Sequence, residues 1–230
     1  MKIIVAILIV LMMDFVMIAQ THYPSKESKE WNDMTVAERW KAVNIPEEKL
    51  KIMTTQELIN HCLNFSFMWD IFNHPDYQSG LQSVAGLHNA LRELLNRHDA
   101  DAMILDYYRS VDLEKVKTYT QSIEIGQFVA QIFFLELFMS YPSVLNQFKG
   151  DEKALIKAVL KSHNRCLSIN AEKDRTWYCG YSIGTKALVI GRILEQYEGS
   201  KLNNPAIDRL DLRKLTKCDY DGIIRKAREL

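Results

Sequence analysis

Residues 180–184, Gly-Tyr-Ser-Ile-Gly, match the G-x-S-x-G pattern of a hydrolase nucleophile elbow. In that arrangement a strained turn between a strand and a helix exposes the serine, and a histidine base follows later in the chain. The last histidine of this sequence is His163, so no histidine follows Ser182. We therefore predict that Ser182 is not a nucleophile. The glycines at positions 180, 184 and 191 are interpreted as small residues where helices pack closely.

A metal site would need three or four ligands, usually including one tightly spaced pair such as H-x-x-x-H or C-x-x-C. Neither pair occurs in the sequence. Glu57 and His61 are four residues apart and could share a helix face, whereas His88, His98 and His163 stand singly. We interpret Glu57 and His61 as an ordinary surface pair on a helix. No metal-binding, cofactor-binding or catalytic residue is predicted.

Four cysteines, Cys62, Cys166, Cys179 and Cys218, are scattered along the chain. In an exported protein they could form up to two disulfides, and a Cys166–Cys179 bond would pin a loop to the last long helix. Buried free thiols are the alternative, because free cysteine is commonly a small apolar core residue. A thiol catalyst built on Cys166 and His163, three residues apart, lacks any sequence feature that would lower a thiol pKa.

Two carboxylates lie on the most apolar helical stretch, Glu124 and Glu136. A carboxylate in apolar surroundings has a raised pKa and can serve as a general acid or base. These two residues are therefore the candidates for a competing hypothesis, a carboxylate-dependent helical hydrolase or lyase. Chance polar positions on a buried helix explain them equally well.

The elements that would position such residues are helices. Thr35-x-x-Glu38 and Thr54-x-x-Glu57 are capping boxes, in which hydroxyl and carboxylate satisfy the backbone N–H groups of a helix start. Alternating runs of β-branched residues, which would indicate strands, are nearly lacking. The expected fold class is all-α, with antiparallel helical hairpins packed as a bundle or a short α-solenoid.

Apolar residues at intervals of three and four predict the individual helices. One period runs from Thr55 to Phe72, and Ser79-Gly80 is expected to break the chain after it. Residues 119–141 are apolar nearly all round, so this helix is expected at the centre of the molecule. A polar loop over residues 168–174 is expected to precede a last long helix over residues 176–197.

The N-terminus has the layout of an export signal: Lys2, an apolar stretch over residues 3–19, and the small residue Ala19 at the end. Asp14 interrupts the stretch, and a stable transmembrane anchor usually has about 20 clean apolar residues. A cleaved signal peptide is the main expectation. An uncleaved signal anchor that tethers the protein to the membrane, or a buried helix, are the alternatives.

Bulk composition excludes some partners. The sequence holds 29 Lys plus Arg and 29 Asp plus Glu, so no net charge drives it toward nucleic acid or an anionic membrane. The basic residues of the C-terminal tail are interleaved with aspartates, which is typical of a solvated face. We expect a protein or peptide partner, no nucleic acid, and no stable membrane insertion after processing.

The stretch Met53–Phe72, with its Thr-x-Glu-Leu-Ile-x-x-Cys-Leu-Asn helix, resembles a group of uncharacterised exported helical proteins. The resemblance extends to the Gly-Tyr-Ser helix near Cys179. It implies an exported all-α fold without an assigned activity, and it assigns a role to no residue.

These observations define a domain plan and a leading hypothesis. Residues 1–20 are expected to be a signal peptide, 21–33 a linker, 34–199 a helical domain and 200–230 a polar helical tail. The leading hypothesis is an exported (periplasmic, cell-surface or secreted) helical binding or scaffold protein. It rests on stacked amphipathic helices, which form extended grooves, and on catalytic patterns that each lack a required residue.

The export hypothesis predicts a mature chain that begins near Gln20 or Thr21. Intact mass or N-terminal sequencing of exported material measures this directly. A chain that retains Met1 in the membrane fraction would instead identify an uncleaved anchor.

Overall fold

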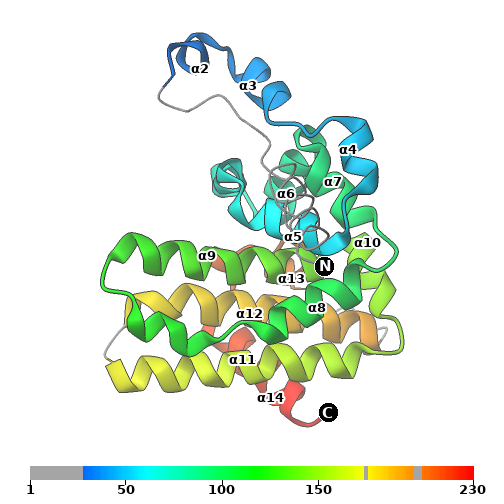
Figure 1. Ribbon diagram of the computed structural model, residues 1–230. Helices are drawn as coiled ribbons and strands as arrows, with labels where there is room; N and C mark the ends of the chain where they lie inside the picture. Colours follow the sequence, from blue (N-terminus) through cyan, green and yellow to red (C-terminus); the bar gives the residue numbers. More distant parts are fainter. Residues whose placement is uncertain (1–27, 174–175, 199–203) are drawn as a thin grey trace, which may run out of the picture. The chain divides into compact units, whose positions relative to one another are not determined.

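The computed structural model describes residues 28–173, 176–198 and 204–230, and side chains within them except those of residues 173–182 and 198. The chain divides into two compact units, and the boundary lies between Lys51 and Ile52. Each is described by itself, with its helices labelled in Figure 1.

The first unit holds the helices α2 (Lys29–Asp33), α3 (Val36–Ala42) and most of α4 (Glu47–Ile52). The predicted capping box at the start of α3 is present: Glu38 Oε2 accepts from the Thr35 backbone N–H at 2.7 Å. Arg39 joins α3 to α2, because its Nε donates to the Trp31 carbonyl at 3.0 Å and its guanidinium lies over the Trp31 ring.

The described residues of the second unit form helices joined by short connections and no strand, so the predicted all-α class is confirmed. Its elements in chain order are α5 (Thr55–Asn64), η1 (Ser66–Asn73), α6 (Tyr77–Leu87), α7 (Asn89–Asn96), α8 (Ala100–Ser110), η2 (Leu113–Thr118), α9 (Ser122–Met139), α10 (Pro142–Leu145), η3 (Asn146–Phe148), α11 (Glu152–Lys173), α12 (Thr176–Glu198), α13 (Pro205–Arg209), η4 (Leu212–Lys214) and α14 (Lys217–Arg228).

Helix α9 lies at the centre of this unit, as its sequence predicted. Its second half is continuously buried from Ile132 to Met139. It packs against its neighbours in the chain, α8 and α10, and also against α5, α6 and α12, which come from distant parts of the sequence. A solenoid hairpin would contact only its neighbours in the chain, so this packing is that of a bundle. Within the described residues, α9 is also the one helix long and apolar enough to cross a membrane, and 56% of it is buried.

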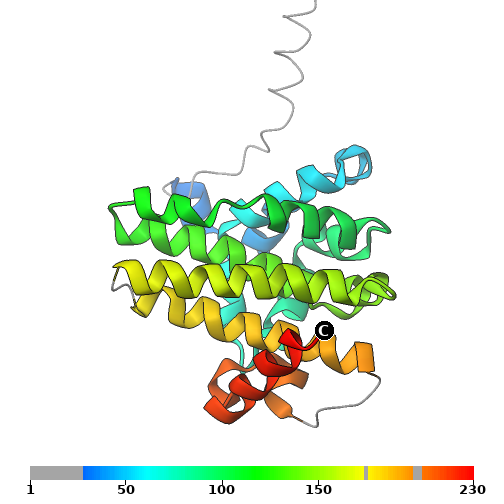
Figure 2. The ribbon, with the colours of Figure 1, turned by 90° about the horizontal axis from the view of Figure 1, so that it is seen from below.

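Helices α11 and α12 form the largest helix pair, and the C-terminal helices pack on α12 (Figure 2). Gly184 lies against Leu212 of η4: a Cβ there would overlap Leu212 Cδ1, so the leucine side chain would have to shift. The mostly buried Arg192 of α12 adds polar bonds, donating to Gln78 at 2.6 Å, to the Ser140 carbonyl at 3.1 Å and to the Asp208 carbonyl at 2.6 Å.

The prediction of one helical period from Thr55 to Phe72 is wrong. Helix α5 ends at Asn64, Phe65 is extended, and residues 66–73 form the 3₁₀ helix η1. The expected break at Ser79-Gly80 is wrong as well, because both residues lie within α6. Gly80 instead permits close packing: a Cβ there would collide with the Ile71 carbonyl oxygen.

The prediction of a polar loop over residues 168–174 is wrong up to Lys173, where α11 ends. Cys166 and Ile169 continue the buried face of α11 in an apolar cluster with Val116 and Ile125. The polar residues of this segment therefore form the exposed face of a helix.

A buried ion pair joins α9 to α12. Lys186 Nζ lies 2.6 Å from Glu136 Oε1, and both side chains have zero exposed surface. The Tyr108 hydroxyl of α8 donates to the same oxygen at 2.9 Å, and the Thr185 hydroxyl of α12 donates to Glu136 Oε2 at 3.0 Å. We call Glu136, Lys186, Tyr108 and Thr185 the buried carboxylate network. A buried charge is tolerated only when it is paired and hydrogen-bonded, so this network sets the relative positions of three helices.

We expect Lys186→Met to lower the free energy of unfolding by about 3–5 kcal/mol, because it leaves an uncompensated buried carboxylate. Adding Glu136→Gln should recover part of this loss, since glutamine accepts the Tyr108 hydrogen bond without carrying a charge. Urea unfolding at pH 7 measures Lys186→Met, Glu136→Gln and the double variant. Losses that simply add in the double variant would show that the two residues are not coupled.

Candidate functional site

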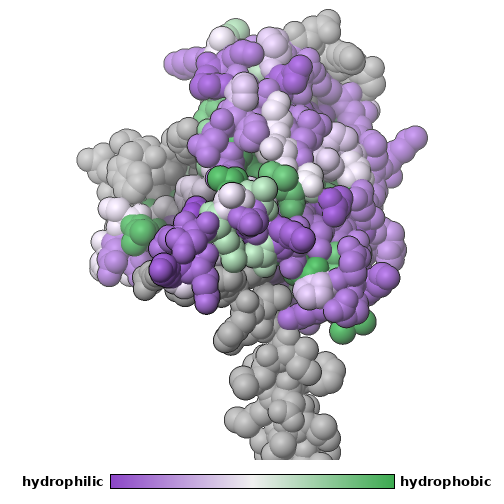
Figure 3. Space-filling view, turned by 90° about the horizontal axis from the view of Figure 1, so that it is seen from above, coloured by the Kyte–Doolittle hydropathy of each residue, from purple (hydrophilic) through white to green (hydrophobic). Residues whose placement is uncertain are grey.

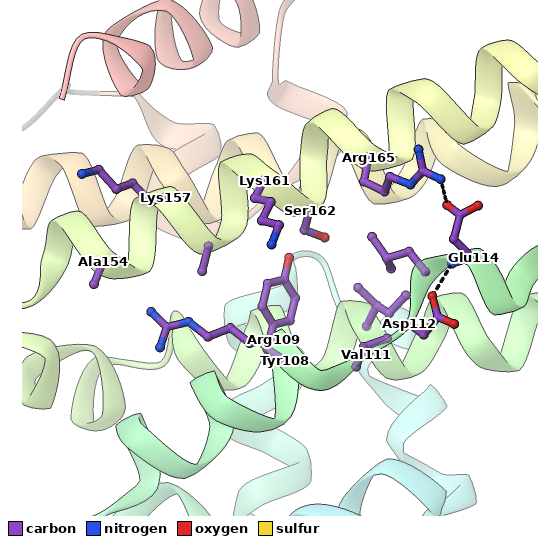
Figure 4. A pocket seen from close by; sticks show the side chains of 13 residues that line it. Tyr108, Arg109, Val111, Asp112, Glu114, Ala154, Lys157, Lys161, Ser162 and Arg165 are labelled. Carbon is purple, nitrogen blue, oxygen red and sulfur yellow. Dashed lines mark hydrogen bonds and ion pairs between the residues drawn. The ribbon is translucent and has the colours of Figure 1, made fainter.

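A groove between α8–η2 and α11 is the candidate site (Figure 4). Its volume is about 620 Å³, within the range of pockets that hold small ligands or a short peptide segment. We call it the α8–α11 groove. It is lined by residues of α8, η2, α9 and α11: Tyr108, Arg109, Val111, Asp112, Leu113, Glu114, Ile132, Ala154, Lys157, Ala158, Lys161, Ser162 and Arg165.

Helix α11 presents two parallel rows of side chains to the groove. The small residues Ala154, Ala158 and Ser162 recur every four positions and leave room above the helix. The cationic residues Lys157, Lys161 and Arg165 recur with the same spacing, about 6 Å along the axis. Adjacent rows at this spacing lie on one face of a helix. The face thus combines an open floor with a line of positive charge.

One end of the groove is electrically neutral. Arg165 forms an ion pair with Glu114, which also pairs with Lys117 at 2.7 Å. Hydrogen bonds from Lys117 and then Arg165 lower the pKa of the Glu114 carboxyl. The neighbouring Asp112 caps η2 by accepting from the Glu114 backbone N–H at 3.0 Å. The charges at this end are therefore matched by groups of the protein.

The other end of the groove is cationic. Lys157 and Lys161 are exposed, and neither forms an ion pair within the described part of the chain. Arg109 has only a distant partner, Asp106 at 3.7 Å, which is itself 74% exposed. The lining holds four cations and two carboxylates, a net charge of +2 that is concentrated here. This end can bind an anionic group.

Tyr108 connects the floor of the groove to the buried carboxylate network. Its ring lines the cavity, and its hydroxyl donates to Glu136. Burial, and then the charge of Glu136, raises the pKa of Tyr108 well above its usual range, while a hydrogen bond with Ser162 opposes the shift. The hydroxyl therefore stays protonated and acts as a fixed structural donor.

A histidine pair lies elsewhere, between α5 and the α6–α7 junction. The Nε2 atoms of His61 and His88 are 3.3 Å apart, whereas the ring centroids are 5.3 Å apart. The two nitrogens therefore face each other, as in an N–H···N hydrogen bond. Phe65 stacks on His88 with centroids 3.8 Å apart. Burial, then His61 and Arg92, lowers the pKa of His88 to about 3.

The two candidate carboxylates do not share a site. Glu136 is fully buried in its network, whereas Glu124 is half-buried and accepts from the Gln121 backbone N–H at 3.3 Å. Twelve residues of α9 separate them, which is about 18 Å along the axis. A general acid and base acting on one bond lie much closer than this.

The remaining candidates are dispersed. Glu57 accepts from the Thr54 backbone N–H at 2.7 Å, in the predicted capping box. Within the described residues no three His, Cys, Asp or Glu side chains form a group that could hold a metal ion. His163 is buried, and its Nε2 is hydrogen-bonded to the Tyr220 hydroxyl of α14.

The Ser182 motif lies on one continuous helix, α12, and not on a strand followed by a turn. The side chain of Ser182 lies outside the described residues, as does that of Cys179, so the Cys166–Cys179 disulfide stays a prediction. Cys62 is a buried free thiol whose pKa is raised by burial, and Cys218 is an exposed free thiol.

Sequence reasoning missed the groove and the buried lysine. The four-residue repeat of cations at 157, 161 and 165, beside a repeat of small residues, was the available signal for the groove. Lys186, a lone charge before the apolar run 187–190, was the signal for a buried ion pair.

Figure 3 shows the distribution of hydropathy over one face of the molecule. The face seen in Figure 3 is mostly hydrophilic, and its apolar residues form small separate areas. Broad apolar patches are the usual mark of a large protein interface.

The functional argument for this chain rests on its geometry, because comparison with known proteins finds no match. The chain matches no protein-family model, no curated protein and no solved structure. The resemblance to exported helical proteins stays a prediction.

The histidine pair predicts a pH-dependent stability. The pKa of His88 is lower in the folded protein than its ordinary value of 6.5, so the unfolded chain binds the proton more tightly. The stability contribution is complete above pH 6.5 and is lost as the pH falls toward 3. Between pH 7 and pH 4.5 the wild type should lose about 2–3 kcal/mol more than His88→Phe, which keeps a ring against Phe65.

Urea unfolding at both pH values measures this difference. His98→Asn, a change at an exposed histidine, is the matched control and should behave as the wild type does. Parallel stability profiles for wild type and His88→Phe would contradict the assignment.

Proposed function

We propose that this chain is an exported helical binding protein that holds an acidic, partly apolar segment of a partner protein in the α8–α11 groove. One observation carries the proposal: Lys157 and Lys161 stand without ion-pair partners in the described residues, beside a cavity with apolar walls. A site of this kind favours a ligand that brings both negative charge and apolar surface.

The size of the groove supports a peptide segment as the occupant. A cavity of about 620 Å³ accommodates a few residues rather than a folded domain. Val111 and Leu113, both partly exposed and lying beside the buried Ile132, offer apolar surface, which contributes about 25 cal/mol per Å² buried. Exposed charge pairs contribute less, and salt screens them. Affinity would therefore come mainly from apolar burial, and selectivity from the lysines.

Export is the second part of the proposal, and the N-terminal signal pattern supports it. An uncleaved anchor would leave the same groove on a membrane-tethered protein. The competing hydrolase or lyase hypothesis has less support, because Glu124 and Glu136 face different surroundings.

An array of synthetic peptides with graded acidic and apolar content tests the proposed function. The wild type should retain peptides that combine both properties. Lys157→Glu/Lys161→Glu should weaken their binding by at least about 10-fold, because it replaces attraction with repulsion at the cationic end.

Lys153→Glu is the matched control. It makes the charge change of one of the two substitutions, on an exposed residue of α11 that lies one turn before Lys157 and outside the groove lining. This variant should bind as the wild type does. Equal binding by Lys157→Glu/Lys161→Glu, or an array on which no peptide is retained, would overturn the proposal.

A further inference from the structure

We propose that the α8–α11 groove orients its ligand, with the acidic groups at the Arg109–Lys157–Lys161 end and the apolar groups toward Val111, Leu113 and Ile132. This inference rests on the proposed function and specifies its ligand class: a segment in which acidic and apolar residues are segregated. A segment in which acidic and apolar residues alternate would fit the groove poorly, because it would place acidic residues against the apolar wall.

The distribution of charge along the groove is the first support. Figure 4 shows Arg109 and Lys157 toward one end, and the Arg165–Glu114 ion pair at the other. An acidic ligand group placed beside Arg165 would compete with Glu114, which already holds that guanidinium. An acidic group beside Lys157 or Lys161 displaces no protein carboxylate of the described residues.

The apolar surface at the neutral end is the second support. Leu113 packs against the buried cluster of Val116, Ile125, Cys166 and Ile169, so its side chain is backed by the core. Val111 and Ile132 separate the groove from a second cavity of about 230 Å³, which they also line. Apolar ligand groups would thus meet an apolar wall beside the Arg165–Glu114 ion pair, whose charges already neutralise each other.

The closing experiment compares two blocked hexapeptides of identical composition. One has three glutamates followed by three leucines, and the other alternates the two residues. The segregated peptide should bind about 10-fold more tightly by calorimetry, because only it satisfies both ends at once. Equal affinities would overturn the orientation and leave the proposed function standing, whereas failure of both peptides to bind would overturn both.

The position of the acidic groups in the groove is tested by combining substitutions in the peptide with substitutions in the protein. Replacing the peptide glutamates by glutamine should weaken binding to the wild type and to Arg165→Gln by similar factors. The same change should have a smaller effect on binding to Lys161→Gln, which has already lost one of the three cations that would contact the glutamates. If the change from glutamate to glutamine weakened binding by the same factor in Arg165→Gln and in Lys161→Gln, the proposed orientation would be overturned. Laurate serves as a third probe: binding of laurate at the groove without either peptide would assign the site to an anionic amphiphile and overturn the peptide proposal.

Discussion

The carboxylate of Glu136 is the constraint on which the second unit depends. A charge without exposed surface must be met by donors, and these come from α8 through Tyr108 and from α12 through Thr185 and Lys186. The relative positions of α8, α9 and α12 are therefore specified more narrowly than apolar packing alone would specify them. Such a network contributes little net stability compared with an apolar core. What it contributes is the position of Tyr108, whose ring then forms the floor of the groove.

The groove forms because two faces of α11 carry different kinds of side chain. One face of α11 carries Leu155, Val159 and Cys166 into the core. The adjoining face carries small residues and cations, so neighbouring helices do not fill the space above it. At the neutral end, η2 supplies Glu114, which neutralises Arg165. No carboxylate among the described residues forms an ion pair with Lys157 or Lys161, in the preceding part of α11. The uneven charge of the groove thus results from one short 3₁₀ helix that covers only part of its length.

The parts of the fold that depend on local chemistry could be predicted from the sequence. The capping box at Thr54 needs only residues three positions apart, and the burial of α9 needs only its own apolar composition. The errors arose where distant residues decide the backbone. Phe65 leaves the helical conformation and stacks on His88, twenty-three positions away, and Gly80 serves the approach of Ile71. The groove could not be predicted for the same reason. The repeated cations of α11 indicate a binding site only when α8 is known to lie opposite them.

The electrostatics of the described residues suit binding better than covalent chemistry. A nucleophile requires a lowered pKa or an adjacent base. The shifts here run the other way: burial raises the pKa of Tyr108 and of the Cys62 thiol, so both stay protonated at neutral pH. The groups left exposed in the groove are ammonium and guanidinium ions, which attract anions. Because Lys157 and Lys161 are solvated, they contribute less to affinity than the apolar wall does, but they penalise any ligand that places a cation beside them. The proposed selection of acidic segments therefore rests on the same geometry that leaves the groove without an activated side chain among its described residues.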